Sequence, residues 1–465
     1  MLPGTDPARP KRCTIRAMLS PVADTTDLPG GTSRRFPLRR SDLAWLGAIV
    51  AVGFALRLAW VLTVPSPERG LVDNAWYFAT ASNLAHGYGM TVSAVTGVGF
   101  VDGPGGYQAV FWPPGYPLTL AGFFTLFGSS IAVAEAVNVA AGTLTVLLTF
   151  LIGARVFGAR VGLIAAALFA VYPANIFWSE VLLSETVFSV PFGIAILLLL
   201  RTSRRPSPVL ALAFGLALGY ATIMRAQASI VWIAALITWW TLYDRRRDAL
   251  RAAAISAVGL VLWVAPVCVW NSARTGEVQL LSTNAVFNLR IGHKPEATGR
   301  YVHPRDPRDL LVVTSPEYTE QRRNLHEAVT YAATHPLREV QLAAWKTIYL
   351  YGTDSDWALW GGASGPIWGS ASATQHLIDL GDAANVMMIL LVLASLPWTL
   401  SAKDERLALW LTLAGWTAVH IVFFSEPRYH LPLLPILLAM AARTLVELPR
   451  LLWGERKVAA PASDG

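Results

Sequence analysis

The chain has 465 residues, of which 54% are hydrophobic and 14% are charged. Soluble domains are about a quarter charged, so this composition excludes an ordinary soluble domain and indicates a polytopic membrane protein. The two cysteines, Cys13 and Cys268, lie in a polar tail and an apolar segment, which excludes a disulfide framework and a cysteine metal site. The net charge of +7 indicates membrane topology rather than nucleic-acid binding, because the sequence contains no compact basic domain.

Residues 1–42 are rich in Pro, Thr and Arg and show no periodicity, which predicts a disordered cytoplasmic tail. The apolar run at 43–64 is long enough to span a bilayer and is not followed by a small-residue cleavage site. We therefore interpret it as a first transmembrane helix rather than a signal peptide.

Ten apolar segments predict an all-α integral membrane protein. They are 43–64, 131–153, 160–178, 184–201, 208–224, 228–243, 250–270, 380–400, 406–424 and 431–450. The short loops on one side carry Arg155, Arg160, Arg201, Arg204, Arg205, Arg245, Arg246, Arg247, Arg251, Lys403 and Arg406. The short loops on the other side hold only Arg225 and Arg428. By the positive-inside rule we expect a multi-pass plasma-membrane protein with both termini in the cytoplasm.

Two long segments, 65–130 and 271–379, then face outward. The first predicts two surface-lying helices separated by a Gly-rich turn region. Asp73 can cap a helix over 74–86, and Gly87 and Gly89 can end that helix. A second helix is expected to begin at Pro117 and to end near Gly128, close to the end of the first loop.

The second long segment, 271–379, begins irregularly at 284–307. A polar helical stretch is expected over 317–351, interrupted at Pro336. The expected organisation is a cytoplasmic tail 1–42, a transmembrane module 43–270, an extracytoplasmic loop 271–379, C-terminal transmembrane helices 380–453 and a cytoplasmic tail 454–465.

Ionisable residues at membrane boundaries are costly and therefore suggest function. Arg57 lies roughly 10 Å below the outer end of the first span, at 1.5 Å per residue. It could bind a lipid phosphate or snorkel to nearby headgroups. Arg225 and Arg428 lie at outer helix ends, where they could grip the same phosphate or act as ordinary anchors. Glu185 follows Ser184 at a helix start, where an acid also suits the helix dipole.

Metal-binding patterns are weak. Asp354-Ser355-Asp356 matches the Asp-x-Asp of nucleotide-sugar enzymes, but we interpret it as a solvated turn. The histidines of the second long loop have no compact metal spacing; they are His293, His303, His326 and His335. We expect no metal and no required cofactor, although a divalent cation remains possible.

Short motifs lie in order along most of the chain. They are Asp73 with Tyr77 and Asn83-Leu84-Ala85-x-Gly87-x-Gly89, Pro113-Pro114-Gly115-Tyr116-Pro117-Leu118 with Phe127-Gly128, Ser184-Glu185-Thr186-Val187-Phe188, Arg225, and Arg428-Tyr429-His430-x-Pro432-x-x-Pro435. Through these motifs and their order, the chain resembles the GT-C glycosyltransferases of the family 39/83 type, which use phospholipid carriers. That group contains protein O-mannosyltransferases, lipid A aminoarabinose transferases and Rgt-like lipopolysaccharide-core transferases.

The chain departs from one pattern of this group. Protein O-mannosyltransferases carry Asp-Glu at the first-loop site, whereas this chain has Asp73-Asn74. The resemblance therefore favours the broader bacterial group, and its conserved module covers roughly residues 43–270. It implies a GT-C fold with about ten transmembrane helices.

The resemblance implies a role for each motif residue. Asp73 would be the general base, against the alternative that it only caps the following helix. The donor phosphate would be bound by Arg57, Arg225, Arg428, Tyr429 and His430. The sugar or acceptor would be contacted by Tyr77, Tyr116, Glu185, His293 and Lys294. A single base without a covalent carboxylate would invert the anomeric configuration, by analogy with inverting glycosidases.

The predicted function is transfer of one sugar from a polyprenyl-phosphate carrier to an extracytoplasmic glycan, lipid or protein hydroxyl. The expected partners are this donor, the acceptor and the lipid bilayer, without nucleic acid. One alternative is a flippase or transporter for lipid-linked glycans, although no internal repeat supports it. Another is an O-antigen-ligase-like transferase that moves a whole glycan.

Overall fold

A computed structural model of the chain describes residues 39–64, 72–95, 99–108, 110–302, 321–361 and 366–453. Three predictions concern residues outside these ranges. They are most of the N-terminal tail (1–38), the C-terminal tail (454–465) and His303.

Six helical runs among the described residues are long and apolar enough to cross a membrane. They are α2 (Arg40–Thr63), α5 (Ile131–Phe157), α8 (Ser184–Thr202), α11 (Arg246–Thr275), α17 (Ala371–Ala394) and the run Pro427–Leu452 within η4 (Pro427–Leu433) and α20 (Leu434–Trp453). Shorter helices occupy the other predicted spans: α6 (Ala159–Val171) with α7 (Pro173–Phe177), α9 (Pro208–Met224), η1 (Ala226–Ser229) with α10 (Ile230–Leu242), and α19 (Arg406–Val422) after the short α18 (Leu396–Thr399). All ten predicted spans are helical, which confirms a multi-pass all-α membrane protein.

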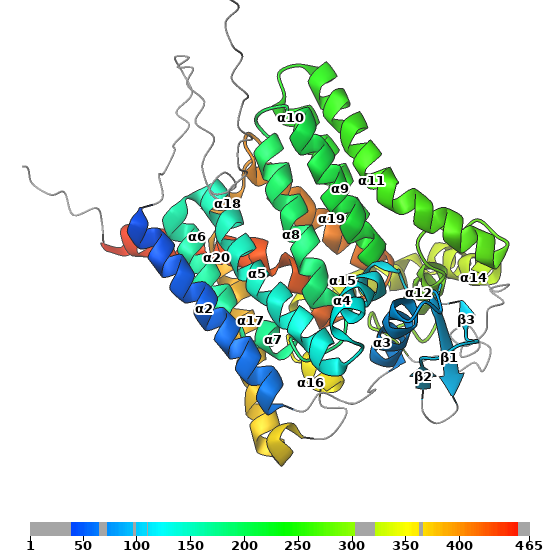
Figure 1. Cartoon of the computed structure of the whole chain (residues 1–465). Coiled ribbons are helices and arrows are strands. Elements are labelled where there is room, and N and C mark those ends of the chain that lie inside the picture. The colour runs from blue at the N-terminus through cyan, green and yellow to red at the C-terminus, as the bar shows by residue number, and fades with distance from the viewer. Residues whose placement is uncertain are drawn as a thin grey trace, which may run out of the picture.

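The long helices pack side by side into a bundle (Figure 1). In α8 and in the run through α20, 78% of the apolar window is buried. In α11 only 17% is buried, and in α2 and α17 only 22%. Apolar side chains on the outside of these peripheral helices suit contact with lipid.

Glycines bring α9 and α11 into close contact. A Cβ on Gly215 would lie 2.0 Å from the carbonyl oxygen of Ser256, and one on Gly259 would lie 2.6 Å from the backbone nitrogen of Leu216. Small residues at such positions allow membrane helices to pack backbone against backbone. This contact fixes the end of α9, where Arg225 follows.

The bundle has two chemically different ends. At one end, Arg155 donates to the carbonyl of Leu200 at 3.3 Å, and Arg204 forms an ion pair with Glu405. We call this the arginine-rich end, and it gathers the loops 155–160, 201–208, 242–251 and 400–406. The opposite end holds both long loop segments, and we call it the site end.

The first long loop contains α3 (Val72–Ala85) and α4 (Gly115–Phe127). Both helices were predicted, and α4 is followed by Gly128 as its C-cap. Between them lies a small antiparallel sheet in the order β2-β1-β3, which the sequence did not predict. Its strands are β1 (Thr91–Val95), β2 (Gly99–Val101) and β3 (Tyr107–Gln108), with Ser93 opposite Val101 and Val92 opposite Tyr107.

The second long loop is more helical than predicted. It contains α12 (Asn284–Gly292), α14 (Gln321–Thr334), α15 (Pro336–Tyr351), α16 (Asp356–Gly361) and the turn η3 (Ile367–Gly369). The expectation of irregular structure over 284–307 was wrong for 284–292, where α12 packs its apolar face on the first loop; residues 293–302 are irregular as predicted, and 303–307 lie outside the described residues. There the ring of Phe287 lies 6.0 Å from that of Phe111, and the backbone N–H of Thr283 donates to the carbonyl of Val110.

Candidate active site at the site end

Asp73 lies half-buried in the first turn of α3. The helix begins at Val72, so Asp73 is within it and is not the N-cap predicted from the sequence. An acid in this turn is still favoured by the helix dipole. The far end of α3 is fixed by Asn83, whose amide donates to the carbonyl of Thr91 at 2.9 Å and accepts from the N–H of Gly103 at 2.7 Å.

Tyr77, on the same helix as Asp73, belongs to a cluster of aromatic rings. Tyr77 lies one turn further along α3, and its ring centroid is 5.1 Å from that of Tyr116 and 6.1 Å from that of Trp112. Burial raises the pKa of the Tyr77 hydroxyl well above its ordinary value, and Asp73 raises it further. Burial also raises the pKa of Tyr116, so both tyrosines are neutral, and the structure brings these two predicted contact residues together, with Tyr77 within electrostatic reach of Asp73.

The glycine of the Pro-Pro-Gly-Tyr-Pro motif positions Tyr116. A Cβ on Gly115 would lie 2.7 Å from the backbone nitrogen of Met224 and 2.8 Å from the carbonyl carbon of Ile223. Only glycine allows α4 to approach the end of α9 so closely. Because Arg225 follows Met224, this contact joins the first loop to a site arginine.

Glu185 joins the two arginines of the site end. Its Oε1 lies 2.8 Å from Nη1 of Arg225 and 3.4 Å from Nε of Arg428. Arg225 also donates to the hydroxyl of Ser184 at 3.0 Å. The Glu185 side chain is 3% exposed, so its main contacts are these guanidinium groups.

Arg428 retains an unused donor. Its guanidinium stacks on Trp360 at 4.2 Å and on Tyr429 at 5.3 Å. Its Nε faces Oε1 of Glu185 at 3.4 Å, whereas its buried Nη1 donates no hydrogen bond to any residue that the structure describes. A buried guanidinium donor without an acceptor favours binding of an anion with several oxygens, such as a phosphate.

The charges around Asp73 set its protonation. Burial raises the pKa of Asp73 to about 6; Arg428 and Arg225 oppose the rise, and Glu185 adds to it. These interactions place Asp73 within electrostatic reach of the Glu185–Arg225–Arg428 cluster. A carboxyl group with this pKa can accept a proton near neutral pH.

His430 lies behind this cluster. It is fully buried, with Nε2 3.1 Å from Oδ1 of Asp354 and Nδ1 2.7 Å from the carbonyl oxygen of Leu350. Its neighbour Tyr429 lies between the arginines, with its ring 5.1 Å from the guanidinium of Arg225. Tyr429 is therefore part of the cluster, whereas His430 supports it.

The structure does not bring Arg57 to the cluster. Its guanidinium is fully buried between helices and donates to the carbonyl oxygens of Gly53 (2.9 Å), Ala170 (3.2 Å) and Phe169 (3.3 Å). Its Nε would lie 2.7 Å from a Cβ on Gly142. Arg57 thus joins α2, α5 and α6 and does not reach headgroups as the snorkelling alternative requires.

The predicted contacts of the second loop also lie elsewhere. His293 forms an ion pair with Glu339 on α15 at 2.8 Å and a hydrogen bond with the carbonyl of Val422 at 2.6 Å. The backbone carbonyl of Lys294, in the same turn, accepts from the N–H of Ala297. The contacts of His293 connect the loop to α15 and the end of α19.

The interpretation of Asp354-Ser355-Asp356 as a solvated turn was wrong. Asp354 is 1% exposed and Asp356 is 6% exposed. Asp354 accepts from the hydroxyl of Tyr172 at 2.6 Å, and Asp356 pairs with Arg300 at 2.9 Å. The motif was visible in the sequence, but its buried partners come from distant segments.

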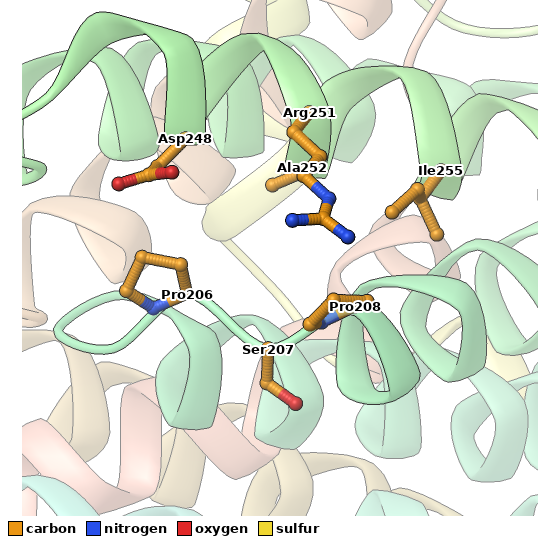
Figure 2. Close-up of a pocket in the computed structure, with 7 residues that line it drawn as sticks. All are labelled: Pro206, Ser207, Pro208, Asp248, Arg251, Ala252 and Ile255. Carbon is orange, nitrogen blue, oxygen red and sulfur yellow. The ribbon is translucent and has the colours of Figure 1, made fainter.

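No metal-binding cluster marks another centre in the part of the chain that the structure describes. No group of three His, Cys, Asp or Glu side chains there could hold a metal ion. One hollow of about 190 Å³ lies at the arginine-rich end, where Asp248 and Arg251 of α11 face the loop at Ser207 (Figure 2). Sites for organic ligands usually measure about 300–1,000 Å³, so this hollow is small for one.

Comparison with known proteins agrees with this architecture. Residues 112–270 match the family described as dolichyl-phosphate-mannose-protein mannosyltransferase. No curated protein matches the sequence. Among solved structures, the apo oligosaccharyltransferase of Archaeoglobus fulgidus superposes with a TM-score of 0.53 at 16% identity, over 88% of this chain and 51% of that one.

Two further structures were compared. The same archaeal enzyme tethered to an acceptor peptide with an NVT sequon gives a TM-score of 0.52 at 14% identity, over 89% of this chain and 50% of that one. ArnT from Cupriavidus metallidurans in the apo state gives 0.40 at 15% identity, over 87% and 77%. The chain spans about half the length of the archaeal oligosaccharyltransferase. The chain is thus similar over residues 112–270 to this mannosyltransferase family, and its helical membrane fold resembles that of the archaeal oligosaccharyltransferase.

Proposed function

We propose that this protein is a membrane glycosyltransferase that moves a single sugar from a polyprenyl-phosphate carrier to a hydroxyl group of a glycan, lipid or protein. The observation that carries the proposal is the cluster at the site end, where one carboxylate with a raised pKa lies within reach of two arginines that share a buried acid. The description of the matching family, a dolichyl-phosphate-mannose-protein mannosyltransferase, supports a prenyl-phosphate donor.

The proposed reaction has one displacement step. Asp73 takes the proton of the acceptor hydroxyl while that oxygen bonds to the anomeric carbon. The bond between this carbon and the phosphate oxygen breaks, and the electron pair leaves with the prenyl phosphate. Arg225 and Arg428 stabilise the negative charge that develops on this leaving group. A single displacement inverts the anomeric configuration, and the step requires no cofactor.

We propose that the site end faces away from the cytoplasm. The loops with most basic residues meet at the opposite end, as the contacts of Arg155 and Arg204 show. Basic loops favour the cytoplasmic side, which puts both termini there and the donor's sugar on the extracytoplasmic side.

The test uses a host strain from which the chain has been deleted. Mass spectrometry of its lipid extract should reveal an accumulating prenyl-linked monosaccharide, and envelope glycans should lack the corresponding sugar. Wild-type protein should reverse both changes, whereas Asp73→Asn should not, because an amide accepts no proton. Asp379→Asn is the matched control, since Asp379 is an exposed carboxylate that accepts only from Gln375 among the described residues.

The outcomes separate the alternatives. Full complementation by Asp73→Asn would refute Asp73 as the base. A transporter should move a lipid-linked sugar across liposomes that contain the purified protein and no acceptor, whereas the proposed enzyme should not. Accumulation of a pyrophosphate-linked oligosaccharide instead of a monosaccharide would favour the ligase-like alternative.

A further inference from the structure

The segment Glu426–His430 carries the Arg428 guanidinium but is poorly fixed by its own backbone. Glu426 is the N-cap of η4, and the rest of the segment lies within this 3-10 helix, which contains Pro427 and Pro432. Proline has no backbone N–H, and 3-10 hydrogen bonds have poorer geometry than those of an α-helix. The position of Arg428 must therefore depend on contacts with other elements.

Asp354 holds the C-terminal side of this segment. Its Oδ1 faces Nε2 of His430 at 3.1 Å, and its Oδ2 accepts from the Tyr172 hydroxyl at 2.6 Å. Nδ1 of His430 faces the Leu350 carbonyl at 2.7 Å, and a carbonyl can only accept, so Nδ1 carries a proton. When Nε2 is also protonated, His430 and Asp354 form a buried ion pair.

Asp356 holds the N-terminal side. Its carboxylate accepts from the backbone N–H of Arg428 and from Nη2 of Arg300, the latter at 2.9 Å. Arg300 also donates to Oε2 of Glu426 at 2.7 and 3.0 Å. Asp356 thus connects to both Glu426 and Arg428.

The short helix α16 adds a third contact. It begins at Asp356 and carries Trp360 one turn later, and Trp360 stacks on the Arg428 guanidinium at 4.2 Å. One helix therefore contacts the backbone and the side chain of Arg428 together.

We propose that Asp354 and Asp356 are positioning residues that hold Arg428 where its unused Nη1 donor meets the phosphate of the lipid carrier. The proposal rests on the proposed function, because it assigns the phosphate to Arg428. It gives the Asp354-Ser355-Asp356 motif a role that requires no metal and no solvent exposure. The motif acts through Arg428 and does not touch the reacting atoms.

The test measures binding of undecaprenyl phosphate to the purified full-length protein in lipid nanodiscs. Arg428→Lys should weaken binding about tenfold, because an ammonium lacks the planar fork of a guanidinium. Asp356→Asn should weaken binding by a similar factor of about ten, since the misplaced guanidinium loses a charge-assisted hydrogen bond. The variant that combines Asp356→Asn with Arg428→Lys should bind undecaprenyl phosphate no more weakly than Arg428→Lys alone, to within about twofold.

Two further variants keep the test independent of folding. Arg300→Gln changes a side chain that is 39% exposed. It removes the ion pairs of Arg300 with Asp356 and with Glu426, and it should also weaken binding. Glu405→Gln is the matched control, because it removes a buried acid from an ion pair at the arginine-rich end and should leave binding unchanged.

The results distinguish the two proposals. If Arg428→Lys weakens binding but Asp356→Asn and Arg300→Gln do not, the positioning role is refuted while the proposed phosphate site stands. Additive losses in the double variant would show that Asp356 acts independently of Arg428, which also refutes the positioning role. If neither Arg428→Lys nor Arg225→Lys weakens binding, the phosphate site itself is wrong.

Discussion

A carboxyl group can act as a general base only while it is ionised. Burial raises the pKa of Asp73 to about 6, so this group is protonated in mildly acidic solution and ionised at neutral pH. The transfer rate should therefore fall about tenfold per unit as the pH drops below about 6, and above pH 7 the titration of Asp73 should no longer change it. The measurement is the rate against pH at saturating donor.

Two variants assign this acidic limb. Asp73→Glu keeps a carboxylate in a different position, so it should shift the midpoint of the limb. Asp356→Asn should leave the midpoint unchanged at saturating donor, because Asp356 does not take the proton. A wild-type rate that is constant between about pH 5 and pH 7 would contradict the assignment.

Glu185 gives a second testable prediction for a single residue. Its Oε1 is shared by Arg225 and Arg428, so Glu185→Gln leaves two neighbouring guanidiniums without their common acid. Loss of one partner from a buried ion pair costs about 3–5 kcal/mol of stability. We expect a lower unfolding temperature and at least an approximately tenfold lower rate per folded molecule.

The control for Glu185 is Glu405→Gln, which also removes a buried acid from an ion pair but at the arginine-rich end. It should lower stability without lowering the rate per folded molecule. Equal rates in the two variants would mean that Glu185 does not orient the arginines.

Single residues at the membrane boundary were more predictable than buried ones. Asp73, Arg225 and Arg428 interrupt apolar sequence at predicted helix ends, and the structure brings them to one cluster. Arg57 interrupts apolar sequence too, but its partners are backbone carbonyls more than 110 residues away, at Phe169 and Ala170. Backbone acceptors leave no trace in side-chain composition, so the sequence could not reveal that role.

At the scale of elements, the contact between α4 and α9 yields a prediction. Gly115→Ala would put a Cβ 2.7 Å from the backbone nitrogen of Met224, so α4 must shift away from α9. Overpacking of this kind costs about 1–3 kcal/mol, and here it also moves Tyr116 relative to Arg225. Thermal unfolding and the transfer rate should both decrease.

The same helix provides the control. Gly122 is exposed, and a Cβ there has nothing within 4 Å. Gly122→Ala should leave the rate unchanged and slightly raise stability, because alanine favours helix by about 1 kcal/mol over glycine. If Gly115→Ala behaves like Gly122→Ala, the close contact does not determine the site.

Long apolar helices were predictable from the sequence, and short irregular elements were not. Hydropathy predicted helices in all ten segments, and six of the helical runs that the structure describes are long and apolar enough to cross a membrane. The strands β1, β2 and β3 have five, three and two residues, which is too short for a period of two to be visible. Helix α12 was missed because its apolar face matches a loop distant in sequence, at Phe111.

At the scale of the whole molecule, the alternation of helices sorts charge between two ends. The ion pair of Arg204 with Glu405 and the bond from Arg155 to Leu200 bring three basic loops together. The cluster around Asp73 lies at the other end. The distribution of basic residues therefore predicted which segments share an end, whereas the pairing of residues within the cluster required the tertiary structure.

This separation makes sidedness testable in intact cells. The background is the Cys13→Ser, Cys268→Ser variant, which has no other thiol because the chain contains two cysteines. Glu296→Cys introduces an exposed thiol at the site end, and Lys403→Cys introduces one at the arginine-rich end. By the positive-inside rule, a membrane-impermeant maleimide should label Glu296→Cys in intact cells and label Lys403→Cys only after permeabilisation. The reverse pattern would put Asp73 in the cytoplasm, where the sugar of an outward-facing carrier could not reach it.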